Sequence, residues 1–209
     1  MSKIEDVKVL VETGKSKKVA AAVQEALDAG DKAQDILDAM IASMGVVGDK
    51  FSSGEIFVPE MLIAAKAMSK GVEVLKPVMA GDGSSSLGTC IMGTVAGDLH
   101  DIGKNLVVMM LESAGFDMVD LGVDVPADKF VEAVKENNNV VLVACSGLLT
   151  TTMPALKEAV QTIKAAYPEM KVIVGGAPVT QEYADEIGAD GYAPDAGSAA
   201  VKAKELATA

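Results

Sequence analysis

The chain has 209 residues, of which 50% are hydrophobic but only 3% aromatic, so its core must be built from aliphatic side chains and from its twelve Met. Acidic residues outnumber basic ones by 30 to 18, and the formal net charge of -12 excludes the basic surface that nucleic-acid binding normally requires. No apolar run approaches the ~18 residues of a membrane span and no signal-peptide pattern opens the sequence, so we expect a cytoplasmic protein that does not enter a membrane.

The N-terminal part of the sequence predicts helices only. A short first helix is expected from Ile4 to Glu12. Apolar side chains then recur at three- and four-residue steps in a second helix that ends at Gly30, in a third that Asp31 caps, and in a fourth with Pro59 in its first turn. Four such stripes predict a small four-helix bundle, and we assign residues 1–86 to it.

A short stretch of small and polar residues, Ala80 to Leu87, follows these helices and predicts a linker. Beyond it, strands and helices alternate. The expected strands are Thr89 to Val95, Met118 to Gly122, Val140 to Cys145, Lys171 to Gly175 and Gly191 to Ala193. The expected helices are Ile102 to Ala114, Ala127 to Asn137, Pro154 to Ala166, Gln181 to Ile187 and Ser198 to Leu206.

Several of these strands are continuously apolar, which is typical of strands that are buried on both faces. We therefore expect an α/β protein in which residues 87–209 form a doubly wound, five-stranded parallel sheet of the Rossmann or flavodoxin-like kind. Cys90 and Cys145 fall in expected strands and lack CxxC spacing, so we expect buried free thiols rather than a disulfide or a metal pair.

The only histidine of the chain, His100, lies on an expected strand-to-helix loop within the sequence GTVAGDLHDIGKN, Gly93 to Asn105. In an open parallel sheet such a loop lies at the carboxyl end of a strand, where ligands bind. Asp98 is two residues before the histidine, so in a locally extended loop both side chains project to the same side. Gly97 and Gly103 flank the pair and permit a large group to approach the backbone.

The loops after the third and fourth expected strands are also unusual. The first contains hydroxyl side chains at Ser146, Thr150 and Thr152, and the second contains the double glycine Gly175-Gly176. Because the strands are expected to be parallel, all these loops emerge at the edge that carries His100. Hydroxyls and bare backbone facing one groove suit a long ligand with a partly polar tail.

Each feature also has an ordinary structural explanation. Asp101 can cap the helix that follows the histidine loop, hydroxyl side chains commonly cap helices, and two glycines make a turn. A lone histidine on a surface loop needs no function. It is the joint placement of these residues at one edge of the sheet that favours a binding site.

The pattern Asp98-x-His100-x-x-Gly103, followed by Ser146-x-Leu148 and by Gly175-Gly176, resembles the corrinoid (vitamin B12) binding signature in order and approximate spacing. Methyl-carrying corrinoid proteins, methionine synthases and B12-dependent mutases have this signature. The resemblance implies cobalamin or a related corrinoid, bound base-off, with His100 as the axial ligand of cobalt, Asp98 as the partner of the imidazole and Thr152 as a further hydroxyl. The family often has Ser where Thr152 stands. The remaining corrinoid contacts that it implies are Gly97, Leu99, Asp101, Gly103, Ser146, Leu148, Thr150, Gly175 and Gly176.

The helical half resembles the cap module of methyl-carrying corrinoid proteins, in which a four-helix bundle covers the upper face of the corrin. The matching segment is VGDKFSSGEIFVPEM, Val47 to Met61. The resemblance assigns Phe51, Val58 and Met61 to the capping surface, although many relatives have Leu where Val58 stands. The cap must move aside for a partner to reach the cofactor, so we expect the linker to act as a hinge.

The function implied by the resemblance is that of a methyl carrier in one-carbon metabolism. The cobalt would cycle between Co(I) and methyl-Co(III), receiving a methyl group from a substrate-specific methyltransferase and giving it to an acceptor methyltransferase that serves tetrahydrofolate or a thiol coenzyme. Donors served by such systems include methoxylated aromatics, as in O-demethylases, methylamines and methanol. A corrinoid reductive activator is a further expected partner. The sequence contains no separate nucleophile-base pair, so we expect little activity from this subunit alone.

Three alternatives have specific objections. A B12-dependent sensor usually has a DNA-binding or signalling domain, for which this chain has no room. The cobalamin subunit of a radical mutase would be covered by a substrate barrel rather than by a helical cap. A doubly wound nucleotide or flavin protein would be expected to show a GxGxxG or phosphate loop after the first strand, and neither is present.

Overall fold

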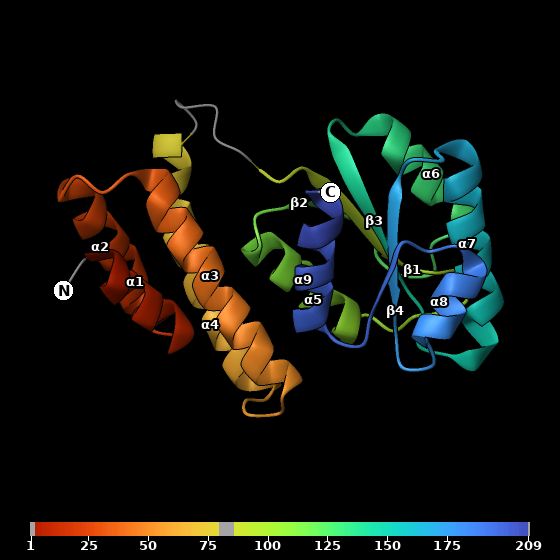
Figure 1. The fold of residues 1–209 in the computed structure, drawn as a ribbon, viewed down its shortest axis with the longest axis horizontal. Coiled ribbons are helices and arrows are strands. Elements are labelled where there is room, and N and C mark those ends of the chain that lie inside the picture. Colours follow the sequence, from red (N-terminus) through yellow and green to blue (C-terminus); the bar gives the residue numbers. More distant parts are fainter. Residues whose placement is uncertain (1–2, 80–85, 209) are drawn as a thin grey trace. The chain divides into compact units, whose positions relative to one another are not determined.

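The structure is a computed structural model that describes residues 3–79 and 86–208 (Figure 1). Contacts divide the chain into two units, Met1–Ser85 and Ser86–Ala209. Most of the expected linker, Ala80 to Leu87, lies outside the described residues, so its role as a hinge stays a prediction. None of the helices in the described ranges is long and apolar enough to cross a membrane.

Amphipathic helices make up the first unit. They are α1 (Lys3–Glu12), α2 (Ser16–Asp28), α3 (Ala33–Ser52) and α4 (Val58–Met79). Helix α1 packs on α2 and α3, and α4 packs on the same two helices. Helix α4 approaches its neighbours closely at Gly71, where an added Cβ would lie 2.3 Å from the Met40 side chain and 2.9 Å from that of Val19.

The connection between α3 and α4 is short. The sequence predicts that Gly48 to Val58 separate the two helices, but α3 continues to Ser52, so Phe51 is on the helix. Helix α4 begins at Val58, where the Glu60 side chain accepts a hydrogen bond from the backbone N–H of Phe57 at 3.1 Å. This bond satisfies an amide at the start of the helix.

The second unit is an alternating α/β structure, as expected. Its strands are β1 (Thr89–Thr94), β2 (Asp117–Asp120), β3 (Val140–Ser146), β4 (Lys171–Gly175) and β5 (Gly191–Ala193). Its helices are α5 (Ile102–Ser113), α6 (Ala127–Glu136), the 3-10 turn η1 (Thr150–Thr152), α7 (Met153–Ala166), α8 (Gln181–Ile187) and α9 (Ala196–Ala207). The second strand was expected from Met118 to Gly122. The observed β2 begins one residue before this range and ends two residues before its end.

All strand pairs are parallel, in the order β2-β1-β3-β4-β5. Helices α6, α7 and α8 lie on one face of the sheet, and α5 and α9 pack together on the other (Figure 1). Strands β1, β3 and β4 are therefore covered on both faces and are mostly buried, whereas β2 is a half-exposed edge strand. The predicted doubly wound parallel sheet is confirmed.

The core between the sheet and helices α6 to α8 is aliphatic, with Phe130 as its largest buried member. Gly93 of β1 makes room for this ring, because a Cβ at that position would lie 2.9 Å from it. Cys90 and Cys145 are buried free thiols, as predicted.

The strand order reverses between β1 and β3, since the chain passes from β1 outward to β2 and then returns to the other side. Such a switch point separates the loops that follow the two strands and leaves a crevice at their carboxyl ends. The loop after β1 contains Asp98 and His100, and the connection after β3 contains Leu148 and Thr152. The topology therefore brings two of the unusual loops to one place.

Candidate functional site

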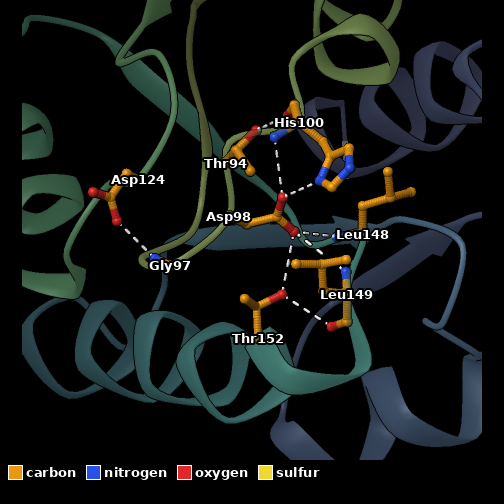
Figure 2. A network of polar contacts seen from close by, with 8 residues as sticks. All are labelled: Thr94, Gly97, Asp98, His100, Asp124, Leu148, Leu149 and Thr152. Atoms are coloured by element: carbon orange, nitrogen blue, oxygen red, sulfur yellow. Dashed lines mark hydrogen bonds and ion pairs between the residues drawn. The ribbon is translucent and has the colours of Figure 1, made fainter.

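A buried carboxylate, Asp98, is the centre of a polar network at the switch point (Figure 2). Its Oδ1 atom lies 2.6 Å from the ring Nδ1 of His100 and accepts the backbone N–H of His100 at 3.1 Å. Its Oδ2 atom accepts the backbone N–H groups of Leu148 at 2.6 Å and Leu149 at 3.3 Å, and the hydroxyl of Thr152 at 3.2 Å. Asp98 thus joins the loop after β1 to the connection after β3.

These donors determine the charge of Asp98. Burial raises the pKa of the carboxyl, but hydrogen bonds from the Leu148 N–H, from the ring and N–H of His100 and from the Thr152 hydroxyl outweigh it and lower the pKa to about 2. Asp98 is therefore ionised at neutral pH. Because an ionised carboxylate only accepts hydrogen bonds, the proton that it shares with His100 is on Nδ1.

The imidazole of His100 is oriented by one nitrogen and presents the other. With the proton on Nδ1, the Nε2 atom of the neutral ring has a free lone pair, and no partner for it is found among the described residues. The side chain is 51% exposed. The hydroxyl of Thr94 also donates to the backbone carbonyl of His100 at 2.9 Å, which fixes the loop. A ring held in this way is prepared to bind a metal through Nε2.

The low pKa of Asp98 predicts a specific acid sensitivity. The pKa of Asp98 is about 2 in the folded protein and ~3.9 in the unfolded chain. At pH values above the unfolded-state pKa, this difference stabilises the fold by about 2.5 kcal/mol. This contribution is lost as the pH falls through the folded value. We therefore expect the difference in unfolding free energy between wild type and Asp98→Asn to shrink by about 2.5 kcal/mol between about pH 5 and pH 1.

Tyrosine fluorescence during denaturant unfolding measures this difference. The chain has no Trp, and its three Tyr all belong to the second unit, so the signal reports that unit alone. Glu132→Gln, which removes an exposed carboxylate, is the control and should follow the wild type. A wild-type to Asp98→Asn difference that does not change with pH would contradict the assignment.

Other residues that sequence reasoning missed hold the histidine loop from the opposite side. The carboxylate of Asp124, in the loop after β2, accepts the backbone N–H of Gly97 at 2.7 Å, and its own N–H donates to the carbonyl of Asp98 at 3.0 Å. Asp124 has φ 55 and Gly97 has φ 80, so both adopt left-handed conformations at this junction. Asp124 is 26 residues after Asp98, and no local pattern connects the two.

Gly176 has a structural role that the sequence did not indicate. It has φ 133, and a Cβ at this position would lie 1.8 Å from the carbonyl oxygen of Gly147. The backbone N–H of Gly147 donates in turn to the carbonyl of Gly175 at 3.0 Å. The double glycine therefore supports the connection that presents the Leu148 N–H to Asp98.

The remaining predicted residues are less closely connected to this network. Ser146 is half-buried at the end of β3, and Thr150 is exposed at the start of η1. A Cβ added at Gly103 would meet nothing within 4 Å. Asp101 occupies the N-cap position of α5, but the capping predicted for its side chain is wrong, because φ -121 and ψ -20 differ from the extended geometry of a capping residue. Its carboxylate instead accepts the side-chain amide of Asn105 at 3.4 Å.

The three predicted capping residues lie on the first unit and differ in exposure. Val58 is exposed, Phe51 is half-buried and Met61 is buried. Phe57, which belongs to the same segment but was not assigned to the capping surface, is 69% exposed. The contribution of these side chains to a cofactor-covering surface stays a prediction.

The site fits a metal that is already held by a macrocycle. Within the described residues, no group of three or more His, Cys, Asp and Glu side chains could hold a metal ion, so His100 would be a single protein ligand. Exposed apolar side chains accompany it in sequence and in space: Leu99 is 73% exposed, Ile102 77%, and Leu148 and Leu149 39% each. An apolar surface around one nitrogen ligand suits the flat face of a corrin ring.

The fold and site define a doubly wound domain that presents one oriented histidine and exposed apolar side chains at its switch point, an arrangement that suits a large cofactor. Residues 88–201 match the family described as "B12 binding domain", and residues 3–76 match a second family with the same description. The chain belongs to the B12-binding protein family, and its cofactor is cobalamin or a related corrinoid.

Similar proteins include "Dimethylamine corrinoid protein 1" of Methanosarcina acetivorans, which is 45% identical over 197 residues, covering 93% of this chain and 92% of the relative. "Trimethylamine corrinoid protein" of Methanosarcina barkeri is 48% identical over 185 residues, covering 86% and 85%. Among solved structures, the "methanol:cobalamin methyltransferase complex MtaBC" of Methanosarcina barkeri contains a chain with 31% identity and a TM-score of 0.83, covering 99% of this chain and 80% of that one. These proteins confirm the corrinoid family that the motif predicted.

Proposed function

We propose that the protein carries methyl groups between two methyltransferases on a corrinoid that is held by His100. The observation that supports this most directly is the ionised, buried Asp98, which holds the imidazole with Nε2 directed away from the carboxylate. The similarity to corrinoid proteins named for dimethylamine and trimethylamine favours a methylamine as the donor. Methanol and methoxylated aromatics are the alternative donors.

A bound corrinoid supplies a cobalt centre that can accept a methyl group from one molecule and give it to another. His100 would hold the cobalt through Nε2. Asp98 makes the imidazole more basic by accepting the Nδ1 proton, and it prevents the ring from turning. Because the pKa of Asp98 is about 2, the carboxylate stays ionised and keeps accepting the Nδ1 proton of His100.

The helical unit is proposed to shield the reactive face of the cofactor. Helix α4 has exposed apolar side chains in its first turns, at Val58, Leu62 and Ile63, and Phe57 precedes them. Together with Phe51, as predicted from the sequence, this end of the unit would exclude water from the bound corrin, whereas the predicted Met61 is buried and is not part of the exposed surface. The partners are a methylamine-specific methyltransferase, an acceptor methyltransferase that serves tetrahydrofolate or a thiol coenzyme, and a corrinoid reductive activator.

The first test is anaerobic reconstitution with hydroxocobalamin, followed by desalting and EPR of the Co(II) form. Protein labelled with ¹⁵N only in histidine distinguishes the protein ligand from the base of the cofactor, because a ¹⁵N nucleus splits each line into a doublet where ¹⁴N gives a triplet. His100 is the only histidine, so a doublet identifies it. We expect a stoichiometric red protein that shows the doublet. A colourless protein would refute the proposal.

The second test is methyl transfer. The reduced, loaded protein is combined with a trimethylamine-, dimethylamine- or monomethylamine-specific methyltransferase and its amine, and methylation of the corrinoid is followed by absorption. We expect methylation with one of these pairs and none without the methyltransferase. If the corrinoid is methylated only with a methanol-specific methyltransferase and methanol, the donor is methanol and not a methylamine.

A further inference from the structure

A buried ammonium group lies at the start of the helix that follows the His100 loop. Lys104 is 3% exposed in the first turn of α5. Its Nζ atom donates to the carboxylate of Asp120 at 2.5 Å and to the side-chain carbonyl of Asn105 at 2.7 Å. A cation in the first turn opposes the helix macrodipole, and burying a charge is costly unless it is paired. Helix stability therefore does not explain a lysine at this position.

The partner of this lysine is at the end of the edge strand. Asp120 is the last residue of β2, and its second carboxylate oxygen accepts the backbone N–H of Gly122 at 2.9 Å. The ion pair thus connects the beginning of α5 to the point where the chain leaves the sheet. We call the segment from Asp120 to Val125 the β2 clamp.

The β2 clamp is also bonded to β1 and to the histidine loop. The N–H of Leu121 donates to the carbonyl of Met92 at 2.8 Å, and the N–H of Thr94 donates to the carbonyl of Gly122 at 3.0 Å. Further along, Asp124 bonds to Gly97 and Asp98, as described above. The loop that carries His100 is therefore held at its start by Asp124, and the helix that ends it is held by Asp120 through Lys104.

We propose that Lys104 and Asp120 are positioning residues for His100. By fixing the first turn of α5 to the β2 clamp, the ion pair sets the distance that the residues from Gly97 to Asp101 must span. Because the ends of the loop are then a fixed distance apart, the loop keeps one conformation. In this conformation the imidazole lies against Asp98 and Nε2 is available as a ligand. This role rests on the proposed function of His100, but it makes its own prediction for the protein without cofactor.

Three variants separate positioning from stability. Lys104→Met and Asp120→Asn each leave one member of the pair without its partner, so both should destabilise the second unit. The double variant Lys104→Met/Asp120→Asn removes both charges, and such replacements are often neutral or stabilising. The double variant should therefore recover stability without recovering the position of His100. Lys104→Arg preserves the charge and should behave as the wild type.

The first measurement is ¹⁵N NMR of histidine-labelled protein without cofactor. Because His100 is the only histidine, its two ring nitrogens give the only imidazole signals. Spectra are compared at a pH where the ring is neutral, and there the wild type should carry the proton on Nδ1 only. The double variant should show a mixture of the two neutral tautomers. We expect the double variant to bind the corrinoid about tenfold more weakly than the wild type, as when other residues that orient a metal ligand are lost. A smaller fraction of the loaded double variant should show the ¹⁵N doublet.

The matched control is the ion pair of Lys164 and Asp190. It has the same N–O separation of 2.5 Å and is also partly buried, and Asp190 accepts the backbone N–H of Val172 at 2.8 Å. Lys164→Met/Asp190→Asn should leave the His100 signals unchanged. A folded Lys104→Met/Asp120→Asn variant with the wild-type tautomer would overturn the proposal, as would loss of that tautomer in Lys104→Arg or in the control. If the wild type loaded with cobalamin shows no ¹⁵N doublet in its EPR spectrum, the proposed function fails. The NMR spectra of the cofactor-free proteins would still decide whether Lys104 and Asp120 position His100.

Discussion

Replacing His100 by Ala is expected to abolish histidine coordination while leaving weak corrinoid binding. The substitution removes the single protein nitrogen presented at the switch point, but it leaves the apolar surface and the glycine-rich loops in place. Loss of a residue that only orients a metal ligand costs 10–100-fold in affinity, so loss of the ligand itself should cost at least about as much. Methyl transfer should fall with it. Equilibrium binding of cobalamin and EPR of the Co(II) form measure the two effects.

A matched control comes from chemical rescue. His100→Gly leaves a space in which free ¹⁵N-imidazole can bind, and the imidazole should restore the doublet. His100→Ala keeps a methyl group in that space, so added imidazole should restore the doublet less well. The variants contain no histidine, so any remaining nitrogen splitting must come from the base of the cofactor or from another side chain. Unchanged cobalamin affinity and methyl transfer in His100→Ala would contradict the role of this residue as the cobalt ligand.

Substitution of Gly176 by Ala is expected to have the second large effect. The new Cβ would lie 1.8 Å from the carbonyl oxygen of Gly147, and φ 133 is unfavourable for any residue with a side chain. Both loops must move apart, and Leu148, which follows Gly147, must move with them. We expect the unfolding free energy of the second unit to fall by about 3 kcal/mol or more, because backbone strain and a backbone clash add.

Gly188→Ala is the control for conformational strain alone. Gly188 ends α8 with φ 83, and nothing lies within 4 Å of a Cβ built on it. Its substitution should cost about 1 kcal/mol, the cost of a left-handed residue with a side chain. Tyrosine fluorescence of the second unit reports both variants. If Gly176→Ala is no less stable than Gly188→Ala, the close approach of Gly176 to Gly147 does not constrain the fold.

The fold was predictable because its signals are local. Continuous apolar strands separated by amphipathic helices determine a parallel sheet covered on both faces, and the sequence placed β1, β3, β4 and β5 within one residue of their observed bounds. Strand β2 was less well placed. Its residues, DMVD, are half-exposed at the edge of the sheet and therefore lack the apolar run that identifies a buried strand.

The site was predictable only in part. Asp98 and His100 are close in sequence, and Thr152 is close to Asp98 in the fold, as the motif indicated. The strongest donors to Asp98 from the second loop are backbone N–H groups of Leu148 and Leu149. Every residue except Pro has such a group, so no pattern of side chains can indicate which ones are used.

By itself the sequence determined which residue is proposed to bind the metal and which carboxylate is near enough to orient it. The register of the strands decided the rest, because it brings together residues that are far apart in the chain. Alignment of β1 with β2 places Asp120 beside the start of α5 and Asp124 beside Gly97, and alignment of β1 with β3 brings Leu148 and Thr152 to Asp98. These partners make Asp98 a buried anion, and they give His100 one defined tautomer. Hydrogen bonds across loops depend on three-dimensional position, and only the folded sheet supplies it.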